Sequence, residues 1–309
     1  MRLRRWFYQK NYLRSIKLPI PVVVVGGIFV GGTGKTPLIL CLLEQLGARG
    51  WQVGVVSRGY GSNSQTARLV TAQMAASLVG DEAALIYRST GRPIAVASNR
   101  VAAAQLLLDR HPEINLILAD DGLQHLRLAR DVEIAVMDGR GLGNGLLLPA
   151  GPLREAPTRL GQVDAIVLRD AGAVAASEAG PPRFAMQTNI THLRHLLSGT
   201  TLAPAEFATR FAQRLAAAGI GYPAQFFAGL AATGLSCETL ALPDHFAFDN
   251  SPFPVDPALA IIVTEKDAVK MAHLVDQRVW VAQAHASVDS NLLDLIEHIV
   301  KESRGSQTA

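Results

Sequence analysis

The residues with the clearest chemical potential follow the first apolar run, where residues 21–37 read PVVVVGGIFVGGTGKTP. A β-branched stretch leads into a glycine-rich turn, and Gly34-Lys35-Thr36 stands at the start of a predicted helix. In such a turn, backbone N–H groups face bound phosphates, the lysine reaches the β- and γ-phosphates, and the hydroxyl binds Mg²⁺. We therefore predict a site for ATP and Mg²⁺, with Lys35 as a catalytic cation. The predicted cofactor-binding residues are Val30, Gly31, Gly32, Thr33, Gly34, Lys35, Thr36 and Pro37.

This phosphate loop departs from the usual pattern at one position. The pattern GxxxxGK[ST] has a glycine five residues before Gly34, where this chain has Phe29. We expect Gly31 and Gly32 to let the backbone approach the phosphates instead.

A second candidate lies in the segment LILADDGLQH, where a predicted strand ends in Asp120-Asp121. A carboxylate at the end of a strand close to the phosphate loop is where a magnesium ligand belongs. Paired aspartates also begin ordinary loops, so the assignment depends on the phosphate loop upstream.

Three further candidates have ordinary structural explanations. Arg58 follows the second predicted strand in SRGYG, at the strand edge where ligands of open α/β sheets bind, and the alternative is a tight turn needing two glycines. Asp81 opens a predicted helix, and taken alone it is better explained as an N-cap. His245, in the segment LPDHF, could be an ordinary hydrogen-bonded loop histidine.

The elements that must position these residues alternate between strand and helix, which is typical of an α/β fold. Strands this apolar on both faces favour a parallel sheet covered by helices. The predicted strands are Pro21–Val25, Gln52–Ser57, Pro93–Ala97, Leu116–Ala119, Glu133–Met137 and Ala165–Leu168. The predicted helices are Pro37–Arg49, Glu82–Thr90 and Val101–Asp109.

After Asp170 the composition becomes small and rich in glycine and proline, which indicates a linker or surface loop. We predict a phosphate-loop domain over residues 19–170, a smaller α/β lobe over 171–301 that closes over the active site, and a flexible tail over 302–309. In the later part we predict helices at Ala205–Ala218 and Asn291–Lys301, and strands at Gln225–Ala228, Ile261–Thr264 and Val279–Ala282.

Charge is concentrated at the N-terminus, because seven basic residues and no acidic residue precede Glu44. The whole chain carries a net charge of only +3, which argues against a nucleic-acid-binding surface. Residues 1–18 mix six of these cations with aromatic side chains and could contact an anionic membrane surface. The alternative is a helix that packs on its own domain. No signal peptide and no complete transmembrane helix is expected.

The cysteine and histidine pattern gives no metal site. Cys41 and Cys237 have no metal-binding spacing, and two unpaired cysteines fit a reducing compartment. His192 and His195 form an isolated HxxH, which we interpret as part of a surface helix. No obligate protein partner is evident.

Together these segments resemble the tetraacyldisaccharide 4′-kinase family of lipid A biosynthesis. The resemblance extends from residue 22 to residue 270. The matching segments are VGGTGKTP (30–37), SRGYG (57–61), VGDEA (79–83), DDGLQH (120–125), GNGLLLPAGPLRE (143–155), AGIGYPAQFF (218–227), LPDHF (242–246) and VTEKDAVK (263–270).

The resemblance implies transfer of the ATP γ-phosphate to the 4′-hydroxyl of tetraacyldisaccharide 1-phosphate, at the cytosolic face of the inner membrane. It implies a two-lobed α/β fold with Asp81 as the catalytic base, acting with His245. The residues that it places around the metal and the phosphates are Thr36, Asp120, Asp121, Gln124 and Glu155. The residues that it suggests for contacts with the acceptor are Arg58, Arg100, Asn144 and Arg154.

The chain departs from the family pattern at Gly27, Asn99, Tyr222 and Gln225. None of these positions is among the predicted catalytic residues, so we expect them to affect details of acceptor binding. A competing interpretation is a phosphate-loop ATPase or switch protein without a lipid acceptor. The segment GNGLLLPAGPLRE and the Asp81 and His245 pair speak against it, since a switch needs neither.

Overall fold

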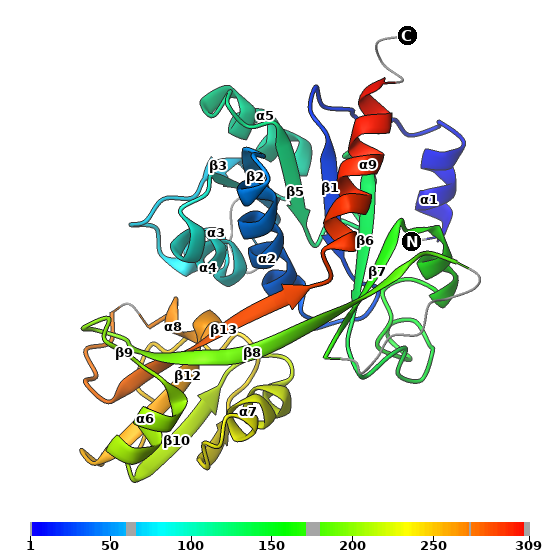
Figure 1. Ribbon diagram of the computed structural model, residues 1–309. Helices are drawn as coiled ribbons and strands as arrows, with labels where there is room; N and C mark the ends of the chain where they lie inside the picture. Colours follow the sequence, from blue (N-terminus) through cyan, green and yellow to red (C-terminus); the bar gives the residue numbers. More distant parts are fainter. Residues whose placement is uncertain (1, 60–65, 171–179, 272, 306–309) are drawn as a thin grey trace. The chain divides into compact units, whose positions relative to one another are not determined.

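The computed structural model describes residues 2–59, 66–170, 180–271 and 273–305, which form two compact units. Unit 1 comprises Met1–Met74, Leu78–Gln187 and Ala286–Ala309, and unit 2 comprises Ala75–Ser77 and Thr188–His285. The main crossings of the chain between the units occur within two long strands, β8 (Arg183–His195) and β13 (Val279–Val288) (Figure 1).

Unit 1 is built on a mostly parallel sheet with the order β3-β4-β2-β5-β1-β6-β7-β8. The strands other than β8 are β1 (Val22–Gly26), β2 (Val53–Ser57), β3 (Arg68–Leu69), β4 (Ile94–Val96), β5 (Leu116–Asp120), β6 (Val132–Met137) and β7 (Ala165–Arg169). Only β3 pairs antiparallel among the described pairings of this unit. Every residue of β1, β2 and β5 is buried, as expected for parallel strands covered on both faces.

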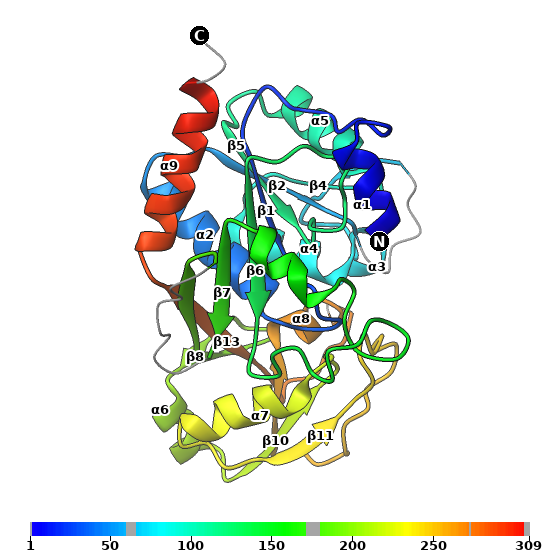
Figure 2. The same cartoon turned by 90° about the vertical axis from the view of Figure 1, so that its right-hand side faces the viewer.

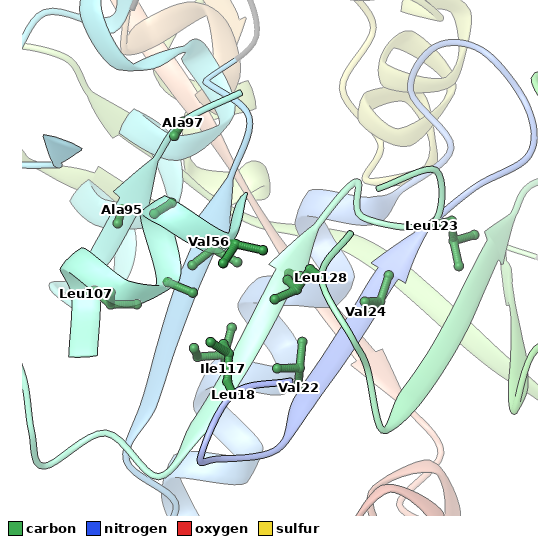
Figure 3. Packing of buried hydrophobic residues seen from close by; sticks show 14 of the residues in the cluster. Leu18, Val22, Val24, Val56, Ala95, Ala97, Leu107, Ile117, Leu123 and Leu128 are labelled. Carbon is green, nitrogen blue, oxygen red and sulfur yellow. The ribbon is translucent and has the colours of Figure 1, made fainter. Parts of the chain in front are cut away.

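Helices cover both faces of this sheet. On one face α2 (Lys35–Ala48) contacts β1, β2 and β5 and packs beside α9 (Asn291–Gly305), whereas α5 (Arg100–Arg110) lies at the other face (Figure 2). Alternation along β1 sends Val22 and Val24 into the core on the α5 side (Figure 3). The remaining helices of this unit are α1 (Arg2–Gln9), α4 (Asp81–Thr90) and the 3₁₀ helix η1 (Pro157–Gln162), whereas α3 (Ala76–Val79) is divided between the two units.

Unit 2 has its own α/β core. Its sheet follows the order β11-β10-β12-β13-β8, with β9 paired antiparallel to β8. The elements that complete it are β9 (Thr201–Leu202), α6 (Pro204–Arg210), β10 (Gln213–Ala218), α7 (Pro223–Ala232), β11 (Glu238–Ala241), β12 (Leu259–Thr264) and α8 (Glu265–Ala268). Phe207 is fully buried and packs edge-on against Trp280, with ring centroids 5.2 Å apart. The two units confirm the predicted fold class, an α/β parallel sheet with helices on both faces and a smaller α/β lobe.

Three local predictions in unit 2 are wrong, namely one helix, one strand and the surface helix expected at the HxxH segment. The predicted helix Ala205–Ala218 is the short α6 followed by the strand β10, whose last four residues are all buried in the sheet. The predicted strand Gln225–Ala228 lies inside α7, which begins with Pro223. In both segments small apolar residues fit either conformation, and pairing with neighbouring strands decides the outcome.

His192 and His195 lie on β8 and not on a surface helix. His195 is buried, its Nε2 lies 2.8 Å from the backbone oxygen of Gln277, and its ring meets Trp280 at 4.9 Å. The side chain is therefore a hydrogen-bonded core histidine.

The C-terminal helix belongs to unit 1, although we expected the second lobe to extend from 171 to 301. Leu292, Ile296 and Val300 are spaced four residues apart on α9 and are all buried. The indole Nε1 of Trp51 also donates to Glu297 Oε1 at 2.9 Å. The helix continues to Gly305, into the predicted flexible tail, and most of the predicted linker after Asp170 lies outside the described residues.

Candidate functional site

The phosphate loop ends at the N-terminus of α2. Gly34 is the N-cap, with φ +100°, and no side chain caps the first turn, so its backbone N–H groups face the loop. Glycine is required at this position because its φ is in the left-handed region. A Cβ atom would also lie 2.5 Å from Arg169 Cδ. The loop has the geometry of an anion-binding turn.

The structure explains why Phe29 is tolerated. Val30 N donates to Pro152 O at 2.9 Å, and Phe29 forms an antiparallel bridge with Leu153. Residues 29–31, the outer arm of the loop, are therefore attached to the segment that follows Gly151. The left-handed residue of this arm is Gly31, with φ +91°. Phe29 instead packs under the guanidinium of Arg140, 4.5 Å from its ring centroid.

Lys35, Asp121 and Arg154 form a charged cluster beside the loop. Lys35 is buried, and its Nζ lies 3.7 Å from Asp121 Oδ1. Arg154 donates to both oxygens of Asp121 at 2.7 Å and to the backbone oxygen of Gly27 at 2.9 Å. Although burial opposes ionisation, hydrogen bonding from Arg154 and the charge of Lys35 lower the pKa of Asp121 to about 2. Asp121 is therefore held ionised between two cations.

Asp120, the last residue of β5, is fully buried. Its Oδ2 accepts a hydrogen bond from Ser57 Oγ at 2.9 Å, while its Oδ1 has no hydrogen-bond partner among the described residues. Burial and the nearby carboxylates of Glu82 and Asp121 raise the pKa of this group, against the opposing effect of Lys35. Such a carboxylate would gain from a bound cation.

Gln124 and Glu155 lie behind the loop and are tied to the N-terminal helix. Gln124 Nε2 donates to Gly27 O at 3.1 Å and to Glu155 Oε1 at 2.8 Å. The other oxygen of Glu155 accepts from Arg5 of α1 at 3.2 Å. Only the basic character of its segment could have pointed to Arg5, because Arg5 and Glu155 are 150 residues apart in the chain.

The donor set fits Mg²⁺ bound through few protein ligands. Among the described residues no group of three or more acidic, histidine or cysteine side chains could hold a metal by itself. Mg²⁺ commonly takes one or two carboxylates together with phosphate oxygens and water. The unpartnered Oδ1 of Asp120 and the hydroxyl of Thr36, in the first turn of α2, suit that mode, whereas Asp121 and Glu155 are already paired.

The residues suggested for the acceptor differ in their surroundings. Arg58 is exposed, whereas Arg100 is buried at the start of α5, and burial lowers its pKa to about 10 against the opposing charges of Asp120 and Asp121. Asn144 closes its own loop, since it donates to Ala150 O at 3.1 Å and accepts from Leu146 N at 3.1 Å. Tyr60 and Gly61 of the SRGYG segment lie outside the described residues.

Asp81 and His245 belong to different units. The N-cap explanation of Asp81 is wrong, because Gly80 occupies the N-cap with φ +90° and Asp81 is the first residue of α4. His245 has the unusual φ of +60°, and its backbone N donates to Gly219 O at 3.1 Å and to Asp244 Oδ1 at 3.0 Å. Non-glycine residues in this conformation are uncommon and are enriched at functional sites.

The comparisons with known proteins agree with each other. The sequence model of the family described as tetraacyldisaccharide-1-P 4′-kinase matches residues 1–301. A tetraacyldisaccharide 4′-kinase of Bordetella parapertussis is 54% identical over 274 residues, covering 86% of this chain and 79% of the relative. The same enzyme of Chromobacterium violaceum is 47% identical, covering 98% of this chain and 90% of the relative.

A solved structure also resembles the whole chain. The crystal structure of LpxK from Aquifex aeolicus in complex with ATP has a TM-score of 0.80 and 26% identity, and it covers 97% of this chain and 94% of that one. None of the described helices is both long enough and apolar enough to cross a bilayer.

Proposed function

The chain belongs to the tetraacyldisaccharide-1-P 4′-kinase family and is an ATP-dependent kinase of lipid A biosynthesis, and from this premise we propose how its residues perform the transfer. The acceptor is a lipid-linked disaccharide. The observation that carries the proposal is the cluster at the start of α2, where a phosphate loop, Lys35 and the carboxylates of Asp120 and Asp121 meet. The alternative of an ATPase without a lipid acceptor is not favoured.

In this proposal ATP binds with its phosphates on the loop Val30–Pro37. The backbone N–H groups at the start of α2 and the ammonium of Lys35 neutralise the charge that develops on the transferred phosphoryl group. Arg154 keeps Asp121 ionised, and Asp121 in turn orients Lys35. Lys35 thus acts from a fixed position.

Thr36 and Asp120 are the residues that would hold Mg²⁺. When bound, the metal supplies positive charge to the phosphate oxygens. Ser57 fixes the Asp120 carboxylate through one oxygen and leaves the other available. Gln124 and Glu155 are proposed to line the metal region, and Gln124 also holds the backbone at Gly27, just before the loop.

Asp81 is proposed as the base that accepts the proton of the attacking 4′-hydroxyl, together with His245. The new bond joins the 4′-oxygen to the γ-phosphorus, the bond between the γ-phosphorus and the bridging oxygen breaks, and ADP leaves. Arg58 and Arg100 are proposed as cations for the acceptor phosphate, and Arg154 contributes to the same region.

The test is turnover in Asp81→Ala and His245→Ala. Both variants are expected to bind ATP normally, as measured by calorimetry, and to lose phosphoryl transfer. Asp109→Asn, an acidic residue of α5 outside the proposed site, is the matched control and should keep full turnover. Full activity of either alanine variant would refute the role of that residue.

The location proposed for the enzyme is the cytosolic face of the inner membrane, with α1 and the residues after it in contact with the lipid surface. Trp6, Phe7 and Tyr12 form an aromatic cluster with centroids 5.3–5.9 Å apart, and Trp6 and Tyr12 are 45% and 70% exposed. Amphipathic aromatic and basic segments bind anionic interfaces. Sedimentation with anionic vesicles should be lower for the double variant Trp6→Ser/Tyr12→Ser than for the parent protein. Equal sedimentation of the parent protein with neutral and with anionic vesicles would contradict the proposal.

A further inference from the structure

The loop that carries His245 is attached to the end of the neighbouring strand. β11, β10 and β12 are parallel neighbours, so their carboxyl ends lie at the same edge of the unit 2 sheet. Leu242, just after β11, donates its N–H to Ala218 O at 2.9 Å, and His245 N donates to Gly219 O at 3.1 Å. The backbone of His245 is therefore held by the residue that follows β10.

Gly219 is itself held by a buried carboxylate from α8, the helix that follows β12. Its N–H donates to Asp267 Oδ2 at 3.0 Å, and Asp267 is fully buried. The same oxygen accepts from Thr264 Oγ1 at 2.8 Å, and the other oxygen accepts from Lys270 Nζ at 2.8 Å. Asp267 thus lies two hydrogen bonds away from the backbone N of His245.

The position of Asp267 is fixed by its own helix. Thr264 ends β12 and caps α8, since its side chain accepts from Asp267 N at 3.1 Å. Thr264 Oγ1 in turn donates to Asp267 Oδ2, so the two side chains hold each other. A carboxylate anchored in this way can define where Gly219 lies.

The space around Gly219 is equally constrained. A Cβ atom there would lie 3.0 Å from Phe246 Cβ, 3.1 Å from Asp267 Oδ1 and 3.3 Å from Pro243 O. A side chain at this position would push the loop of His245 away from Asp267. Glycine is the residue that allows both contacts at once.

We infer that Asp267, held by Lys270, is a positioning residue for the kinase reaction, which acts through Gly219 to keep His245 in its left-handed conformation. The inference rests on the proposed role of His245. A buried ion pair could merely stabilise unit 2. The specific contact with Gly219, whose carbonyl receives the His245 N–H, points to a role in placing the imidazole as well.

The test is a double-mutant cycle of Asp267→Asn with His245→Ala. Asparagine keeps the shape but cannot accept from Gly219 N and Thr264 while also pairing with Lys270. Asp267→Asn alone is expected to lower kcat by about tenfold with KM for ATP within about twofold, because ATP binds elsewhere. In the His245→Ala background the same change should lower kcat by less than about twofold, because its route of action is already removed.

Matched variants separate positioning from loss of stability. His195→Gln perturbs another buried hydrogen-bonded side chain of unit 2 and should lower the melting temperature while leaving kcat unchanged. Gly219→Ala tests the same contact while keeping both charged side chains of the ion pair, and it replaces Asp267→Asn if that variant does not fold. Gly219→Ala alone is also expected to lower kcat. In the His245→Ala background it should cause no further loss of kcat.

Each outcome decides the matter. Multiplicative losses in the double variant, or an unchanged kcat in Asp267→Asn and Gly219→Ala, would overturn the inference and leave the role of His245 intact. Full turnover of His245→Ala would overturn both the inference and the proposed role of His245. A loss in His195→Gln equal to that in Asp267→Asn would assign Asp267 to stability alone.

Discussion

Replacing Glu133 by glutamine removes the central anion of a buried cluster in unit 1. Glu133 accepts from Arg130 Nη1 at 2.8 Å and from Arg159 Nη2 at 2.5 Å, and both Glu133 and Arg159 are buried. In the variant, the ion pair left to Arg159 among the described residues is the longer one, between its Nε and Glu155 Oε2 at 3.8 Å. Removing one partner of a buried ion pair typically costs about 3–5 kcal/mol, and glutamine retains one acceptor, so we expect about 3 kcal/mol.

Thermal unfolding followed by circular dichroism measures this loss. Unit 1 has roughly 200 residues, and each kcal/mol then shifts Tm by about 2–4 °C, which gives an expected fall of about 6–12 °C at pH 7. Burial opposes ionisation of Glu133, but Arg159 and Arg130 outweigh it and lower its pKa. Glu133 therefore stabilises the fold fully at pH values above about 4.3, the pKa of a glutamate in the unfolded chain. This stabilisation is lost as the pH falls through the lower pKa of Glu133 in the folded protein.

The two proteins should accordingly differ by a constant amount above about pH 5 and converge in acid. Glu302→Gln is the control, because Glu302 pairs with His298 on the exposed face of α9, and it should leave Tm within about 1 °C. A Glu133→Gln variant that melts within 2 °C of the parent, or a difference that does not shrink in acid, would refute this account of the cluster.

Three further predictions follow from other parts of the molecule. Lys35→Met should lower kcat/KM by at least about 10²-fold in a coupled ADP assay, because a buried cation at the transferred phosphate is lost; a loss under threefold would contradict its role. Asn99 caps α5 by accepting from Val101 N at 3.2 Å, so Asn99→Ala should cost about 1 kcal/mol in urea unfolding, whereas Asn99→Asp should cost nothing. Phe207→Ala should destabilise unit 2 by about 3–5 kcal/mol and raise hydrogen exchange there but not in α2, and uniform exchange would contradict separate cores.

Features encoded by neighbouring residues could be predicted from the sequence. The β-branched run before Gly26 forms β1, the GKT segment opens α2, and Asp120 ends β5 where the sequence places it. Each depends on a local pattern, namely consecutive buried β-branched residues, a glycine turn or a carboxylate after a strand. Local patterns of this kind constrain the backbone strongly.

Features that depend on distant partners could not be predicted. Nothing near Arg154 indicates that it pairs with Asp121, which lies 33 positions away in the chain. Nothing near Arg5 indicates that it pairs with Glu155, which lies 150 positions away. The segment 213–218 is small and apolar, which suits a helix or a buried strand equally, and only its parallel neighbours β11 and β12 make it a strand. The placement of α9 in unit 1 likewise depends on the face it shares with α2.

The central claim is that this chain moves the γ-phosphoryl group of ATP to a sugar hydroxyl. The most direct measurement incubates the protein with γ-labelled ATP, Mg²⁺ and tetraacyldisaccharide 1-phosphate in mixed micelles and follows the label. We expect label to appear in the lipid at the 4′ position and ADP to form in equal amount, and we expect both to cease when the acceptor is omitted or Asp81 is replaced by alanine. Label released only as inorganic phosphate, at the same rate with and without the acceptor, would contradict it.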